Sequence, residues 1–186
     1  MENKEFIVLD ENGNPIEKSI WEKTKEKLKE AAQHQLVVAI GETGLDSLKG
    51  APLEVQEQVM QAHINIASAS GKPLIIHCVR TSQQVLKLWR DNPEAHNVAW
   101  VIHGFRGNEN VARQLLDAGF YLSYGSKHNA EALAITPVDH LLVETDDEPS
   151  STIKQALKEV AQAKDCSVWR LRRQVRRTAL KIVKYK

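Results

Sequence analysis

The chain has 186 residues, 42% of them hydrophobic and 26% charged, which is ordinary for one soluble domain with a buried core. Its formal net charge of +1 gives the whole molecule no strong attraction for nucleic acid or acidic partners. The sequence shows no membrane-spanning apolar run, no signal peptide and only two cysteines. We therefore expect a single domain over residues 1–186, located in the cytoplasm and without membrane contact.

Six short apolar runs are the strand candidates. Most are continuous rather than alternating, which is typical of parallel strands covered on both faces. The segments between them show helical spacing, as in the stretch that begins at Pro52 and in Ser167–Tyr185. This alternation predicts an α/β fold with right-handed crossovers. In chain order, the runs are Glu5–Asp10, Leu36–Gly41, Pro73–Cys78, Val98–His103, Phe120–Tyr124 and His140–Thr145.

The apolar stretches within four of these runs, Leu36–Gly41, Leu74–Ile76, Val98–Ile102 and Leu141–Thr145, each lead into a residue that can bind a metal ion. The residues are Glu42, His77, His103 and Asp146. The carboxyl ends of parallel strands meet at one edge of the sheet, where such folds bind ligands, so these side chains should lie together. A site of mixed imidazole and carboxylate ligands suits Zn or Mn better than Mg, because Mg prefers a site made of oxygen ligands alone. The sequence thus predicts a divalent metal site at this edge.

The motifs around these positions resemble those of the TatD family of metal-dependent deoxyribonucleases, which are amidohydrolase-like barrels. The resemblance rests on Gly41–Asp46, Pro73–His77, Ile102–Gly107 and Leu142–Asp146, in the family's order and spacing, and Gly119–Ser123 resembles the strand before the last motif. It implies a TIM-barrel-like (β/α) fold. A closed barrel has eight strands, and only six candidates are found, so we expect a barrel that is shortened or incomplete at the N-terminus.

One family motif is absent from this sequence. The family begins with a His-x-His pair, whereas no histidine here precedes His34. Carried over by resemblance, one metal site keeps Glu42, His77 and His103, and the other keeps only Glu42 and Asp146. We therefore expect one divalent ion, Zn, Mn or Mg, rather than two, unless another chain or a substrate group supplies ligands.

The resemblance implies hydrolysis of phosphodiester bonds in DNA by a metal-activated water, with Asp146 as the base. Two alternatives stay open: a degenerate relative that binds metal or nucleic acid without turnover, and a small-molecule amidohydrolase on the same barrel. An open groove lined by Arg106 and Lys127 would favour a polyanion over a small molecule. An incomplete barrel would also expose a strand edge, through which the chain could form an oligomer.

Other residues carry weaker predictions. Arg106, in the loop after His103, can bind a phosphate, although a surface salt bridge is an equal alternative. His128 can reach the mouth of the site as a second substrate contact. Glu144 lies two residues before Asp146 and so can accept a hydrogen bond from a metal-binding histidine, or it can be a structural glutamate. The arginines and lysines after Asp165 are interpreted as a solvated helix face rather than a DNA-binding one.

Overall fold

The computed structural model describes residues 8–9, 15–16, 18–146 and 152–183. Five parallel strands form its sheet in the order β3-β4-β5-β6-β7. Their bounds are β3 Ile40–Asp46, β4 Leu74–Val79, β5 Trp100–Ile102, β6 Tyr121–Tyr124 and β7 Leu141–Val143.

The strand order follows the order of the chain, without the reversal that marks a doubly wound sheet. A consecutive parallel order is that of a (β/α) barrel, which confirms the expected TIM-barrel-like α/β fold. Among the residues that the structure describes, no strand joins β7 back to β3, so the barrel is not closed there.

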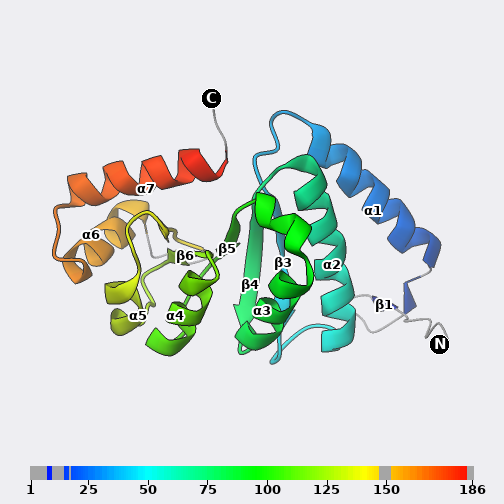
Figure 1. Ribbon diagram of the computed structural model, residues 1–186, viewed down its shortest axis with the longest axis horizontal. Coiled ribbons are helices and arrows are strands. Elements are labelled where there is room, and N and C mark those ends of the chain that lie inside the picture. The colour runs from blue at the N-terminus through cyan, green and yellow to red at the C-terminus, as the bar shows by residue number, and fades with distance from the viewer. Residues whose placement is uncertain (1–7, 10–14, 17, 147–151, 184–186) are drawn as a thin grey trace.

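Helices alternate with these strands. Figure 1 shows α1 outside α2, which packs beside β3, while α6 and α7 lie at the other end of the sheet against β7. The helices are α1 Lys18–Gln33, α2 Leu53–Ser70, α3 Ser82–Asp91, α4 Glu109–Asp117, α5 Ala130–Ile135, α6 Ile153–Ala163 and α7 Val168–Ile182, with a 3-10 turn, η1, at Pro93–Asn97.

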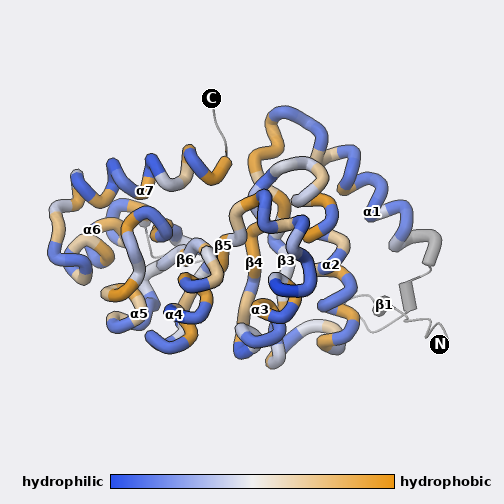
Figure 2. Tube along the Cα trace, in the orientation of Figure 1, coloured by the Kyte–Doolittle hydropathy of each residue, from blue (hydrophilic) through white to orange (hydrophobic). Residues whose placement is uncertain are grey.

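The core lies between the sheet and the helices. The strands β4 and β5 are mostly hydrophobic, whereas α1 and α7 carry many hydrophilic residues (Figure 2). All three residues of β5 are buried, as a strand covered on both faces requires. Polar side chains fix where several helices begin: Asn108 and Ser167 accept hydrogen bonds from the backbone N–H groups of Val111 and Arg170.

One strand prediction was wrong in its bounds. The strand expected at Leu36–Gly41 begins only at Ile40, and Leu36 is 78% exposed. Of the expected strand Glu5–Asp10, the structure describes Val8–Leu9 as β1, which pairs antiparallel with β2, Pro15–Ile16, in a sheet separate from the main one. Residues 5–7 and 10 lie outside the described residues.

The pairing of β3 with β4 explains why this strand begins later than the apolar run Leu36–Gly41. Ile40 pairs with Leu74, and from Thr43 to Asp46 β3 pairs with Ile76 to Val79, so polar residues continue the ladder beyond the apolar run. Glu42 consequently lies inside its strand rather than just after it, whereas His77 lies inside β4 as expected. His103 and Glu144, by contrast, directly follow β5 and β7.

Candidate metal centre

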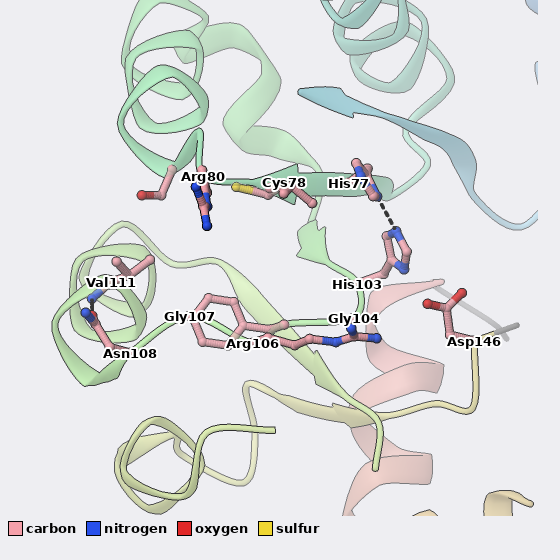
Figure 3. Close-up of a pocket in the computed structure, with 13 residues that line it drawn as sticks. His77, Cys78, Arg80, His103, Gly104, Arg106, Gly107, Asn108, Val111 and Asp146 are labelled. Carbon is pink, nitrogen blue, oxygen red and sulfur yellow. Dashed lines mark hydrogen bonds between the residues drawn. The ribbon is translucent and has the colours of Figure 1, made fainter. Parts of the chain in front are cut away.

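Glu42, His77 and His103 converge at the carboxyl edge of the sheet, from β3, from β4 and from the end of β5. Glu42 Oε1 lies 3.1 Å from His77 Nδ1 and 2.7 Å from His103 Nε2. The two ring nitrogens are 3.3 Å apart, and Figure 3 shows the rings turned toward each other. Three residues that are 26 to 61 positions apart in the sequence thus present one ligand atom each to a common point.

The spacing of these three atoms fits a tetrahedral metal ion. Bonds of roughly 2.1 Å from a zinc ion to nitrogen and oxygen ligands place neighbouring ligand atoms about 3.4 Å apart. The observed separations of 2.7, 3.1 and 3.3 Å are close to one face of such a tetrahedron. Glu42, His77 and His103 could therefore hold a divalent ion with small side-chain movements, and a fourth position would stay open.

Asp46 positions the ring of His77. Its Oδ2 lies 3.1 Å from His77 Nε2, while its Oδ1 accepts the backbone N–H groups of Leu48 at 2.7 Å and Lys49 at 3.1 Å. These bonds lower the pKa of Asp46, that from Leu48 most strongly, so it is a carboxylate at neutral pH. The ring N–H at Nε2 then points to Asp46, and Nδ1 keeps its lone pair for a metal. This role of Asp46 was not predicted from the sequence, although Asp46 ends the Gly41–Asp46 motif.

Glu144 stands beside His103 from the end of β7. Its Oε1 accepts the backbone N–H of Gly104 at 2.6 Å and lies 3.6 Å from His103 Nδ1. The interaction with Glu144 raises the pKa of His103 to about 9, and the charge of Glu42 adds to this effect. A metal ion would therefore replace a proton on His103 at neutral pH.

Asp146 is exposed and follows β7, with a φ of +48°. Asp146, Glu144 and His103 form a second group whose ligand atoms lie within 4.8 Å of one another. Within the described part of the chain, His103 belongs to both candidate groups, whereas Asp146 is not grouped with Glu42. The structure thus places Asp146 beside His103 and Glu144, and its roles as ligand and base remain predictions.

A pocket of about 490 Å³ adjoins the centre and includes His77, His103, Asp146 and Arg106 in its lining (Figure 3). Arg106 is exposed and has no ion pair with any residue that the structure describes, so the salt-bridge alternative finds no partner there. Cys78 also lines the pocket, but burial raises the pKa of its thiol and keeps it protonated.

The structure does not bring His128 to this pocket. Its Nδ1 lies 2.9 Å from the backbone oxygen of Gly125, and its ring packs edge-on against Tyr124. His128 follows β6, and this placement turns it toward its own strand instead of the two metal-binding histidines. Lys127 is likewise not among the lining residues.

Known proteins resemble this chain over most of its length. The model of the family described as TatD related DNase matches residues 14–184. An uncharacterized metal-dependent hydrolase, YabD of Bacillus subtilis, is 32% identical over 155 residues, which are 78% of this chain and 60% of the relative. A protein of Cronobacter turicensis named 3'-5' ssDNA/RNA exonuclease TatD is 33% identical over 148 residues, 72% of this chain and 54% of the relative.

The fold of a solved relative agrees with these matches. The crystal structure of YjjV, a TatD homologue of Escherichia coli K12, superposes with a TM-score of 0.77 at 19% identity, covering 89% of this chain and 71% of that one. The chain spans between 54% and 60% of the length of the two relatives named above. No helix among the described residues is both long and apolar enough to cross a bilayer. From the family match over nearly its whole length, this chain belongs to the TatD family.

Proposed function

We propose that this chain hydrolyses phosphodiester bonds in DNA, using one divalent ion held by Glu42, His77 and His103. The observation that carries the proposal is the convergence of these three side chains at tetrahedral ligand spacing. The ion, when bound, would polarise a phosphoryl oxygen and lower the pKa of a water. The relative named as a 3'-5' ssDNA/RNA exonuclease supports a nucleic acid as the substrate.

Other residues of the chain would accept the proton, bind the phosphate and orient the histidines. Asp146, at the rim of the pocket, accepts the proton of the attacking water. Arg106 holds a phosphate oxygen through its guanidinium group, which is free of ion pairs with the described residues. Asp46 and Glu144 hold the two histidines in orientation. Because the pocket is lined by arginine, a polyanionic substrate fits it better than the small amide or ester of an amidohydrolase.

We propose that one ion binds rather than two, because the sequence has no His-x-His pair. We also propose that the protein acts in the cytoplasm.

We further propose that copies of the chain pair through the outer edges of β3 and β7, which have no neighbouring strand among the described residues.

Hydrolysis of single-stranded DNA with added Mn²⁺ tests this function. We expect cleavage that stops with a chelator and falls at least about a hundredfold in His77→Ala, because two ligands bind an ion too weakly. His34→Ala is the matched control, because this exposed histidine lies just after α1 and away from the centre. Its replacement should leave the rate of DNA cleavage unchanged. Cleavage that survives both the chelator and His77→Ala would remove the proposal. Metal binding without cleavage would instead identify a degenerate relative.

A further inference from the structure

The pocket beside the metal centre continues away from it, toward the starts of α3 and α4. His77 and His103 form one end of it, and Asn108 and Val111 of α4 lie at the other (Figure 3). The proposed reaction uses only the end at the histidines. Its volume of about 490 Å³ lies within the range of small-ligand pockets, so a ligand larger than the reacting phosphate fits.

Two arginines line this pocket, and the guanidinium group of Arg106 points toward Asp146 rather than toward Arg80 (Figure 3). Arg80 follows β4 and Arg106 follows β5, each three residues after a candidate metal ligand, His77 or His103. Figure 3 shows Arg80 on one side of the pocket and Arg106 on the opposite side. Both are exposed, and neither has an ion pair or hydrogen bond with a residue that the structure describes. Two unneutralised guanidinium groups around one pocket match an anion, above all a phosphate.

The start of α3 adds to the positive character of this wall. Thr81 precedes the helix, but its hydroxyl donates to the backbone oxygen of Leu45 at 2.7 Å instead of capping the first turn. Ser82, the first residue of α3, lines the pocket. Asn108, in contrast, caps α4 through the N–H of Val111. The positive end of α3 is therefore left without a side-chain cap beside the two arginines.

The rest of the wall is apolar and indicates more than a free phosphate ion. Val79, Phe105 and Val111 line the pocket, and Phe105 is only 5% exposed. Such a surface suits the sugar and base of a nucleotide. A nucleotide that lies here would place one phosphate at Arg80 while the next phosphate along the strand reaches Arg106 and the metal ligands.

We propose that this pocket binds the nucleotide next to the bond that is cut, and that Arg80 holds the phosphate on its far side, while Arg106 stays with the reacting phosphate. This inference rests on the proposed phosphodiesterase function and extends it. Arg80 is a positioning residue, because it contacts a phosphate that does not react. The enzyme should then prefer substrates that carry a phosphate on this nucleotide.

Binding of thymidine 5'-monophosphate to the full chain in chelator, measured by calorimetry, tests the pocket without any hydrolysis. The nucleotide should bind at least about tenfold more tightly than thymidine, a difference of about 1.4 kcal/mol. Arg80→Gln should abolish most of this preference, and Arg80→Lys should restore part of it. Arg90→Gln is the matched control, because Arg90 is an exposed arginine at the other end of α3.

Each outcome decides the question. Equal binding of the nucleotide and thymidine, or an unchanged preference in Arg80→Gln, would overturn the pocket assignment. If inorganic phosphate binds as tightly as the nucleotide, the pocket does not bind the sugar and base, and that part of the assignment is overturned.

In the DNA assay, Arg80→Gln should raise KM at least about fivefold with kcat nearly unchanged. If no variant of the assay shows cleavage but the nucleotide preference holds, the hydrolase proposal fails and the binding pocket stands.

Discussion

The contact between Asp46 and His77 determines which nitrogen of that ring can bind a metal ion. Asp46 can only accept hydrogen bonds, since the N–H groups of Leu48 and Lys49 keep it ionised. The proton of a neutral His77 therefore sits on Nε2, and Nδ1 faces Glu42 as a lone pair. A single carboxylate thus selects the tautomer that the metal centre needs.

Asp46→Asn should weaken metal binding by about 10- to 100-fold while the fold stays intact. The amide oxygen would still be required by the N–H groups of Leu48 and Lys49, so the amide NH₂ would face His77. It would donate to Nε2 and move the ring proton to Nδ1, the metal-binding atom. Titration with Zn²⁺ against a competing chelator measures the change.

The matched control for this variant is Asp139→Asn. Asp139 also contacts a histidine, His140, with 3.3 Å between Oδ1 and Nδ1, but outside the metal centre. Its replacement should leave the affinity for Zn²⁺ unchanged. An Asp46→Asn protein that binds Zn²⁺ like the unaltered chain would contradict the tautomer argument.

Individual site residues differ in how far the sequence reveals them. Glu42, His77 and His103 were expected to converge because each follows or ends an apolar run, and the structure brings them together. Asp46 was missed, because its role depends on a turn at Leu48 and on a neighbour 31 residues away. His128 follows a strand as His103 does, yet its ring turns back to Gly125, and no sequence pattern reports that direction.

At the scale of the elements, the close approach of β3 to β4 sets the distance between Glu42 and His77. Gly44 pairs with His77 in the ladder and has a φ of +152°. A Cβ atom on Gly44 would lie 1.9 Å from the backbone oxygen of His77. Only glycine therefore allows β3 to lie this near the strand that carries the histidine.

Gly44→Ala should lower the free energy of unfolding by about 3 kcal/mol or more, because backbone atoms of both strands must move apart. Urea denaturation followed by circular dichroism measures this loss. Metal affinity should fall as well, since Glu42 and His77 would separate.

Gly119→Ala isolates the effect of the backbone angle. Gly119 has a φ of +85°, but a Cβ atom there would meet nothing within 4 Å. Its replacement should cost only about 1 kcal/mol and leave metal affinity unchanged. Similar losses for both variants would show that the contact between β3 and β4 is not what requires glycine at position 44.

The same pairing explains why the bounds of β3 were not predictable from hydrophobicity. The apolar run Leu36–Gly41 indicated a strand, but burial depends on where β4 begins, at Leu74. The register with β4 then fixes the pairing of the later β3 residues, and the polar residues Thr43 and Asp46 are among them. The short strands β5, β6 and β7 were located correctly because each lies within an apolar run with a buried residue at its centre or start.

At the scale of the whole molecule, alternating strands and helices were enough to predict the parallel α/β sheet, and the structure confirms them in consecutive order. The last helix also follows its expected pattern: Leu171 and Ile182 of α7 are buried and its arginines are exposed. The count of six strand candidates also predicted an incomplete barrel, and among the described residues the sheet is open between β7 and β3. The candidate metal centre takes one ligand from β3, one from β4 and one from the end of β5, so one ion would link three strands of an open sheet.

This linkage makes the stability of the whole molecule depend on metal. An ion at 100 times its dissociation constant adds about 2.7 kcal/mol to the free energy of unfolding. For a chain of this size, that raises Tm by about 5–10 °C. Differential scanning calorimetry with and without Zn²⁺ should show this shift for the unaltered chain, and His77→Ala should lose it.

The shift should also be larger at pH 8.5 than at pH 6.5. The pKa of His103 is raised to about 9 in the folded, ion-free protein, above the ordinary value of about 6.5. Protonated His103 therefore stabilises the ion-free fold fully below about pH 6.5, and this contribution is lost as pH rises through about 9. At low pH the ion must displace that proton, whereas at high pH it meets a nearly free ring nitrogen. A shift that is independent of pH, or one that persists in His77→Ala, would place the ion elsewhere in the molecule.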